Sequence, residues 1–194
     1  MVTGPQVIII AGPNGSGKTT LAPFLLRDEL RVLEYINADP IAQGLSGFDP
    51  ASVAVKAGRV MLNRLHELAR QQKTFAFEST LSAKHYARWI KKLRSRGYAF
   101  QLMFLWLRSA ELAVQRVRER VRAGGHDVPE QVIRRRYDAG LKNFWELYKP
   151  LADAWSVYDN SESVNSLPIA SEGTEIPFSI SDQDSWASFA STRP

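Results

Sequence analysis

The chain has 194 residues, 44% of them hydrophobic and 23% charged, a composition that fits one globular domain able to bury most of its apolar surface. Its longest early apolar run, Val7 to Ala11, is far shorter than the ~20 residues that span a bilayer, and no basic segment precedes it as in a signal peptide. The absence of cysteine excludes disulfide scaffolds, thiol catalysis and cysteine-type zinc sites. We therefore expect a cytoplasmic protein that has no membrane partner.

The charge is spread unevenly along the chain. The net charge is +5, but residues 84–149 carry 16 Lys and Arg against 6 Asp and Glu, whereas residues 150–194 carry 1 against 7. A basic segment of this size favours an anionic partner, either a phosphorylated small molecule or a nucleic acid. The alternative is a solvated face on which the stems of Lys and Arg cover apolar surface.

Strand and helix patterns alternate over the first 160 residues, which predicts an α/β fold with a central parallel sheet covered by helices on both faces. The predicted strands are 7–11, 33–36, 74–77, 98–107 and 155–158, and the predicted helices are 19–30, 49–72, 82–96, 110–122 and 129–148. Residues 1–160 are expected to form one domain, with a lid around 108–148. The Ser-rich, acidic residues 161–194 form an extension that packs on this domain or trails from it, as a small hairpin or a loose tail with apolar clusters at 176–180 and 186–189.

A phosphate-binding loop follows the first strand. Residues 12–19, Gly-Pro-Asn-Gly-Ser-Gly-Lys-Thr, match G-x-x-x-x-G-K-[ST] and stand between a buried strand and a helix, which is the context that the motif requires. Lys18 is expected to reach the β- and γ-phosphates and Thr19 to bind Mg²⁺, while backbone N–H groups converge on the phosphates. We predict that ATP and Mg²⁺ are bound by Gly12, Asn14, Gly15, Ser16, Gly17, Lys18, Thr19 and Thr20.

Two other classes of P-loop protein lack support in the sequence. The guanine-reading tetrapeptide N-K-x-D is absent, and no apolar strand ends in the Asp-Glu pair that motor-type and AAA-type ATPases need. The class that remains is the small phosphotransferase. The predicted fold is therefore a P-loop NTPase of the kinase type, with a central parallel sheet, flanking helices and a small helical lid.

Carboxylates stand at the ends of the next two strands. Asp39 comes just past the strand 33–36, and Glu78 closes the strand that begins at Thr74. Because the loops after parallel strands line one edge of the sheet, both carboxylates are expected beside the phosphate-binding loop.

The roles of these two carboxylates follow from phosphoryl-transfer chemistry. Asp39 is the leading candidate for the group that takes or orients the acceptor proton, and a turn begun by Asp39 and Pro40 is the alternative. Glu78 is a candidate for ordering Mg²⁺ through water or holding a substrate hydroxyl, with an ion pair to an arginine as the alternative. Ser79 and Thr80 are predicted hydrogen-bond donors to the acceptor.

Two Arg-rich helices form the predicted lid. They carry seven arginines, about two of which are expected to reach phosphates in the manner of an arginine finger, while the others are surface charge. The segment 124–127 between them, Gly-Gly-His-Asp, is typical of a hinge. The three histidines are dispersed without metal-ligand spacing, so that a zinc site is not expected.

The ordered set of motifs is more specific than any one of them. It consists of the phosphate-binding loop, Asn37-Ala38-Asp39-Pro40-Ile41-Ala42, Phe77-Glu78-Ser79-Thr80, Arg120-Val121, and Gly124-Gly125-His126-Asp127-Val128-Pro129-Glu130 running into Arg135-Arg136-Tyr137. Over about residues 5–160 the chain resembles the zeta toxin family of P-loop kinases. The resemblance implies ATP-dependent phosphorylation of UDP-N-acetylglucosamine on a sugar hydroxyl and a separate antitoxin protein as partner. It also implies Asp39 as the base, Lys18 as the P-loop lysine, and Arg120, Arg135 and Arg136 as a clamp on the phosphates.

Two alternatives to this function stay open. One is a kinase of a nucleoside, an antibiotic or an RNA end, and the other is a basic nucleic-acid-binding module in which ATP switches the conformation. The second is disfavoured because the basic residues concentrate on the lid helices and no strand carries interleaved aromatic residues. Nucleic acid is therefore not expected as a partner.

Overall fold

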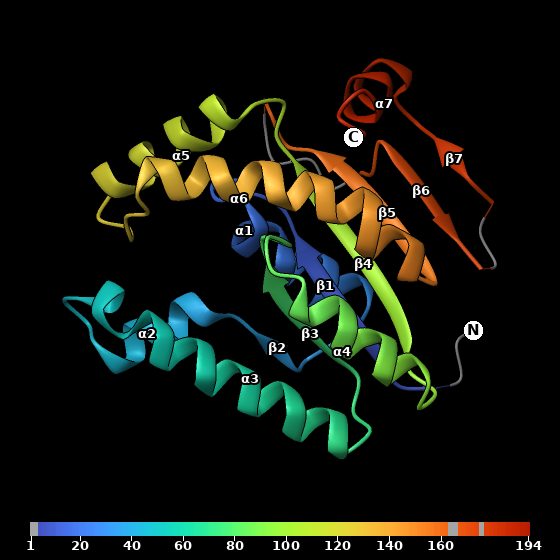
Figure 1. Cartoon of the computed structure of the whole chain (residues 1–194), viewed down its shortest axis with the longest axis horizontal. Helices are drawn as coiled ribbons and strands as arrows, with labels where there is room; N and C mark the ends of the chain where they lie inside the picture. Colours follow the sequence, from blue (N-terminus) through green and yellow to red (C-terminus); the bar gives the residue numbers. More distant parts are fainter. Residues whose placement is uncertain (1–3, 163–166, 175–176) are drawn as a thin grey trace.

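A mostly parallel sheet with helices on both faces forms the frame of the computed structural model, which describes residues 4–162, 167–174 and 177–194 (Figure 1). In these residues the sheet has seven strands in the order β2-β3-β1-β4-β5-β6-β7. The first five are parallel, and β6 and β7 pair antiparallel to their neighbours. The predicted α/β fold is confirmed, with an antiparallel edge added. The strands are β1 (Gln6–Ala11), β2 (Tyr35–Ile36), β3 (Phe75–Ser79), β4 (Ala99–Trp106), β5 (Ala154–Asp159), β6 (Ala170–Gly173) and β7 (Ser179–Ile180).

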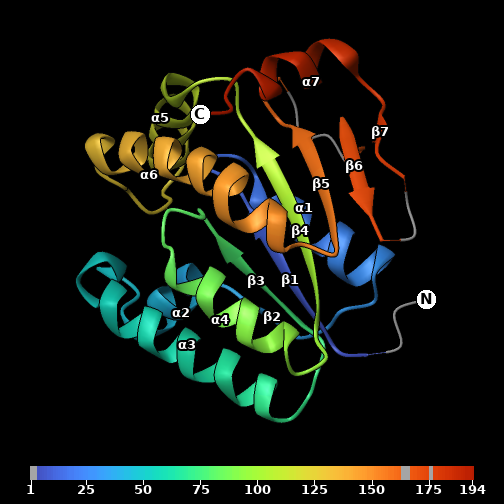
Figure 2. The ribbon, with the colours of Figure 1, turned by 45° about the vertical axis from the view of Figure 1, so that its right-hand side comes forward.

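The side chains of β1 alternate between the two faces of the sheet, and each face has its own apolar cluster. Val7 and Ile9 join the cluster beneath most of the helices, whereas Ile8 and Ile10 join the cluster that α1 covers. All four are fully buried, as expected for a central strand of a parallel sheet. Figure 2 shows α4 and α6 on the same side of the sheet. The helices are α1 (Lys18–Ala22), α2 (Ala38–Leu45), α3 (Ala54–Arg70), α4 (His85–Arg94), α5 (Ala110–Arg122), α6 (Glu130–Asn143) and α7 (Gln183–Ala190).

Three of the expected helices change type along their length. The helix expected at 129–148 is α6 followed by a π-helical turn over Phe144–Tyr148. The helix expected at 19–30 begins as α1 and continues as a π-helical turn over Pro23–Glu29, because Pro23 has no N–H to donate to the preceding turn. The helix expected at 49–72 begins with the 3-10 turn Pro50–Val53 before α3. Its cap is confirmed, since Asp49 accepts a hydrogen bond from the N–H of Ser52 at 3.3 Å.

Helix α2 is absent from the expected elements, which treat Asp39 and Pro40 as a loop or a turn. Asn37 begins this helix, and its side chain accepts a hydrogen bond from the N–H of Asp39 at 2.9 Å. Pro40 is tolerated because the N–H groups of a first helical turn have no partner within the helix. Asp39 therefore lies on a helix that begins at the end of β2.

The described part of the C-terminal extension packs on the sheet. Strands β6 and β7 form an antiparallel hairpin beside β5, and α7 follows them. Phe189 on α7 is fully buried, with its ring centroid 5.3 Å from that of Phe144 and 5.4 Å from that of Trp106. Ile176, at the start of the expected apolar cluster 176–180, lies outside the described residues.

Truncation of Phe189 tests how firmly the extension contributes to the core. We expect Phe189→Ala to lower the free energy of unfolding by about 3 to 5 kcal/mol, because it removes a fully buried ring from the aromatic cluster. Denaturant unfolding measures this change. The matched control is Phe178→Ala, which removes a half-exposed ring from the same extension and should cost much less. Equal, small losses in both variants would contradict this packing.

Candidate active site

The phosphate-binding loop packs closely against β4 and α5, at positions where only glycine fits. Gly12 has a φ of 145°, and a Cβ there would lie 2.3 Å from the backbone oxygen of Leu105. Gly15 has a φ of 80°, and its Cβ would lie 3.0 Å from the Cβ of Arg116. These close approaches fix the loop against both neighbours, so that its backbone N–H groups lie at the start of α1.

Lys18 is the first residue of α1, and its ammonium group is held by the loop itself. Its Nζ donates to the backbone oxygens of Gly12 at 2.9 Å and Pro13 at 2.8 Å. Burial lowers the pKa of Lys18, and the negative charges of Glu78 and Asp39 oppose this shift. The lysine is thus a buried cation in a site that also holds two carboxylates.

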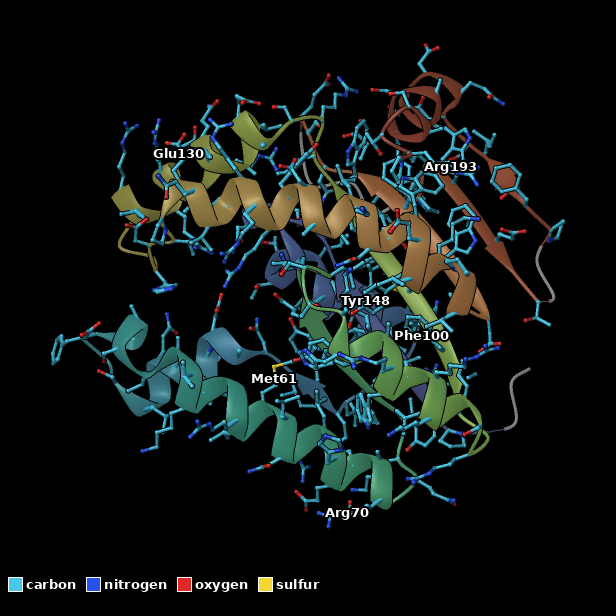
Figure 3. All side chains as sticks on the ribbon, in the orientation of Figure 1. Met61, Arg70, Phe100, Glu130, Tyr148 and Arg193 are labelled. Atoms are coloured by element: carbon cyan, nitrogen blue, oxygen red, sulfur yellow. The ribbon has the colours of Figure 1, made fainter. Side chains whose placement is uncertain are left out.

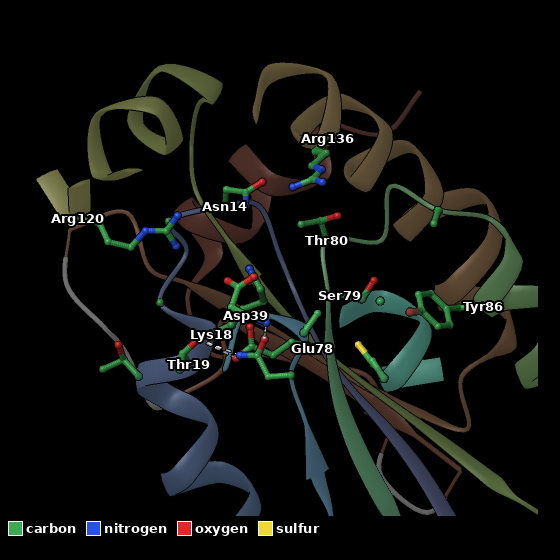
Figure 4. A pocket seen from close by; sticks show the side chains of 18 of the residues that line it. Asn14, Lys18, Thr19, Asp39, Glu78, Ser79, Thr80, Tyr86, Arg120 and Arg136 are labelled. Carbon is green, nitrogen blue, oxygen red and sulfur yellow. Dashed lines mark hydrogen bonds between the residues drawn. The ribbon is translucent and has the colours of Figure 1, made fainter. Parts of the chain in front are cut away.

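A hydrogen-bond network joins the P-loop to the ends of β2 and β3 (Figure 4). Thr19 Oγ1 donates to Glu78 Oε1 at 2.9 Å, and the hydroxyl of Tyr35 donates to the same carboxylate oxygen. Asn37 Nδ2 lies 3.5 Å from Thr19 Oγ1. Burial, and next the nearby charge of Glu78, raise the pKa of Tyr35 well above its ordinary value, which keeps its hydroxyl a donor. The network holds Glu78 beside Thr19, whereas no arginine pairs with Glu78 within the described ranges.

These elements surround a cavity of about 510 Å³ that contains most of the residues expected in the site (Figure 4). Asp39 lines it from the first turn of α2. The expected residues that line it are Asn14, Gly15, Gly17, Lys18, Thr19, Thr20, Asp39, Glu78, Ser79, Thr80, Arg120 and Arg136. Gly12 and Ser16 belong to the P-loop without lining the cavity, and Arg135 is exposed on α6, outside the cavity.

Three lid arginines line the cavity, and the two that were expected in the site come from different helices. Arg120 on α5 donates to the backbone oxygen of His126 at 2.6 Å, which ties it to the segment between α5 and α6. A Cβ on Gly125 would lie 2.5 Å from Arg120 Cγ, so that only glycine leaves room for this side chain. Arg136 on α6 is half-buried, and this burial lowers its pKa, as does the charge of Arg135.

Most of the other lid arginines have partners away from the cavity. Arg118 pairs with Glu130 at 2.7 Å, and Arg134 pairs with the same carboxylate at 2.9 Å. Arg116 donates to the backbone oxygen of Ser161 at 3.0 Å, although it also lines the cavity. The expectation that about two of the seven arginines reach phosphates stays a prediction.

Five residues of the cavity wall, one of which is Ala83, were not singled out in the sequence analysis. Gly58 and Met61 on α3 and His85 and Tyr86 at the start of α4 line it opposite the P-loop. The rings of His85 and Tyr86 lie 4.0 Å apart, and burial lowers the pKa of His85. Their only sequence signal is that α4 begins shortly after β3.

The part of the chain that the structure describes contains no cluster of three His, Cys, Asp or Glu able to hold a metal ion.

The fold and the cavity define a P-loop kinase-like domain. A family model described as "AAA domain" matches residues 7–146, and the chain belongs to this family. The family's description names the AAA domain, although the chain lacks the Asp-Glu pair of AAA-type ATPases and Glu78, next to last in β3, has no neighbouring Asp. An uncharacterized protein of Haemophilus influenzae is 30% identical over 132 residues, which make up 68% of this chain and 92% of that protein.

Solved structures share the fold at low sequence identity. The crystal structure of AvrRxo1-ORF1:AvrRxo1-ORF2 with sulphate ions matches with a TM-score of 0.77 and 15% identity, over 98% of this chain and 65% of that one. The PezAT chromosomal toxin-antitoxin system of Streptococcus pneumoniae matches with a TM-score of 0.60 and 16% identity, over 81% and 69%. Shikimate kinase from Acinetobacter baumannii matches with a TM-score of 0.50 and 20% identity, over 84% and 87%.

Among the described residues, no helix is both long and apolar enough to cross a membrane.

The lowered pKa of Lys18 predicts how ATP binding depends on pH. Because burial disfavours the charged ammonium, Lys18 loses its proton at a lower pH than a solvated lysine, and its attraction for phosphate is lost as the pH rises. We expect ATP affinity to fall from neutral to alkaline pH in calorimetric titrations. Lys18→Met should bind ATP more weakly and lack this fall. Parallel pH curves for the two proteins would contradict the assignment.

Proposed function

We propose that the protein is an ATP-dependent kinase that transfers the γ-phosphoryl group to a hydroxyl group of a small molecule. The observation that carries this proposal is that one cavity joins the P-loop, the carboxylate of Asp39 and the cations Arg120 and Arg136. A nucleotide on the P-loop would direct its γ-phosphate toward this cavity. Residues 1–160, with the lid around 108–148, would form the kinase domain, and residues 161–194 its extension.

The residues around Thr19 suit a hard divalent cation. Thr19 Oγ1 and Glu78 Oε1 lie 2.9 Å apart beside the P-loop, and Mg²⁺ prefers oxygen ligands of these kinds. We assign the metal contact to Thr19, and to Glu78 the positioning of the metal through water. When bound, Mg²⁺ would neutralise charge on the β- and γ-phosphates.

Transfer itself needs a proton acceptor and charge stabilisation. The acceptor oxygen forms a bond to the γ-phosphorus as the bond to the bridging oxygen breaks, ADP leaves with that electron pair, and the hydroxyl proton passes to Asp39. Lys18, Arg120 and Arg136 would stabilise the charge on the moving phosphoryl group. Arg135 is exposed outside the cavity, so we give it no phosphate contact in this arrangement.

The far end of the cavity would hold the acceptor. Ser79 and Thr80 supply hydroxyl groups there, while Tyr86 and Met61 supply an aromatic ring and an apolar side chain. A sugar hydroxyl fits this combination, and the resemblance to zeta toxins makes UDP-N-acetylglucosamine the specific acceptor that we propose. The fold likeness to a toxin-antitoxin system supports a separate antitoxin protein as partner.

A phosphoryl-transfer screen tests the proposed function. The purified protein is incubated with radiolabelled ATP, Mg²⁺ and a panel of nucleotide sugars, nucleosides, aminoglycosides and RNA ends, and the labelled products are separated. We expect label to appear on a hydroxyl-bearing small molecule, with UDP-N-acetylglucosamine the first candidate. Binding of ATP without transfer to any member of the panel would contradict the kinase assignment.

Asp39→Asn separates the proton acceptor from a turn-forming residue. The change keeps size and helix-start geometry but removes the basic oxygen, so transfer should fall by roughly 10²-fold or more while ATP affinity stays within a few-fold. Rate and binding are measured on the same preparation. Asp49→Asn is the matched control, because it alters a capping carboxylate outside the cavity. Similar rates for Asp39→Asn and the control would remove Asp39 from the mechanism.

Glu78→Gln tests the metal assignment. The amide keeps the shape of the side chain but removes its charge, so the Mg²⁺ concentration for half-maximal transfer should rise by about 10-fold or more. ATP affinity without Mg²⁺ should change little. An unchanged Mg²⁺ dependence would make Glu78 a structural partner of Tyr35 and Thr19 only.

A further inference from the structure

Basic residues without carboxylate partners lie on α3 and α4 as well as on the lid. Residues 54–98 contain 11 Lys and Arg but only two acidic residues, Glu67 and Glu78. Glu67 pairs with Arg64, and Glu78 faces the active-site cavity. Carboxylates from outside the segment also pair with it, Glu34 with Arg64 and Lys73, and Asp153 with Arg94. On the lid, Glu111 and Glu130 likewise neutralise part of the charge. The expectation against nucleic acid considered the basic residues of the lid, whereas α3 and α4 form a second basic region that the sequence analysis did not weigh.

Helix α4 carries a row of exposed cations. Every fourth residue from just before the helix to just after it is basic, so that neighbouring members are about 6 Å apart along the helix axis. None of the four has a salt-bridge partner among the residues that the structure describes. Like charges at this spacing repel one another, so the row destabilises the helix when no anion is bound to it. Its members are Lys84, Arg88, Lys92 and Arg96.

A groove with aromatic rings runs between α3 and α4, beside this row. It has a volume of about 480 Å³, and His66 from α3 meets Trp89 from α4 in it, with ring centroids 5.0 Å apart. Arg70 and Arg96 line the same groove. Figure 3 shows Arg70 at the end of α3, directed away from the sheet. The groove thus combines exposed guanidinium groups with the faces and edges of rings.

We propose that the outer face of α3 and α4 binds single-stranded nucleic acid, with its phosphates along the α4 row and a base in the groove at His66 and Trp89. A linear array of cations matches the repeated charge of a strand, and an aromatic groove beside it offers a place for a base to stack. An acidic protein would use the cations but has no need of the rings. This surface is separate from the P-loop, so its binding requires neither ATP nor transfer.

Binding is measured by fluorescence anisotropy with a labelled oligouridylate of about 12 nucleotides over a series of salt concentrations. Five phosphate contacts, at the row and Arg70, predict a slope of about −3.5 for the logarithm of affinity against the logarithm of salt concentration. Arg88→Ala/Lys92→Ala removes two exposed contacts and should reduce the steepness of the slope by about 1.4. His66→Ala should weaken binding while leaving the slope unchanged.

The matched control is Arg122→Ala/Lys142→Ala, which removes the same charge from exposed positions on α5 and α6. We expect it to bind as the native protein does. Equal losses in the two double variants would overturn the assignment to α4. Tight binding of polyglutamate of the same charge would indicate an acidic protein as the partner and overturn the nucleic-acid assignment. These outcomes do not depend on whether the protein is a kinase, because no ATP is present.

Discussion

The carboxyl ends of β1, β2 and β3 meet at one edge of the sheet, and the candidate active site depends on this meeting. Ala11 at the end of β1 is in register with Ser79 of β3, and the N–H of Gly12 donates to the backbone oxygen of Ser79 at 3.2 Å. Ile36 of β2 is in register with Phe77 of β3. The P-loop, Glu78 and Asn37 therefore lie side by side, because the segments that follow parallel strands lie at the same edge of the sheet.

The lid is joined to this edge by two close backbone approaches. Gly15 of the P-loop packs against Arg116 of α5, and Gly140 of α6 packs against Thr80, where a Cβ would lie 2.5 Å from the backbone oxygen. Both contacts leave no room for a larger residue. They fix the rotation of α5 and α6 about their axes, which decides which lid side chains face the phosphates.

The P-loop and the strands could be predicted from the sequence, because glycine spacing and continuous apolar runs are patterns of a few consecutive residues. The pairing of Tyr35 with Glu78 was not predictable, since the two residues are 43 positions apart and meet only through the β2–β3 register. The choice between Arg135 and Arg136 was not predictable either. Consecutive helix residues point about 100° apart, and the orientation of α6 depends on tertiary contacts.

The pairing of charged residues was also not predictable from the sequence. The count along the chain identifies a basic segment, but it does not show that Arg118 and Arg134 share the carboxylate of Glu130 while Arg88 and Lys92 pair with none in the described residues. The sequence also predicted no helix at residues 38–45, whereas α2 places Asp39 in a fixed first helical turn and not in a loop. In both cases the missing information is which distant residues fold together.

The central claim is that P-loop and lid cations surround the position of the moving phosphoryl group. Fluorine-19 NMR of the protein with ADP, Mg²⁺ and aluminium fluoride tests it directly, because the fluoride complex mimics that group in transfer. We expect protein-bound fluorine resonances that shift in Arg120→Lys and Arg136→Lys and vanish in Lys18→Met. Binding of ADP without any bound fluoride resonance, or resonances unchanged in the arginine variants, would contradict it.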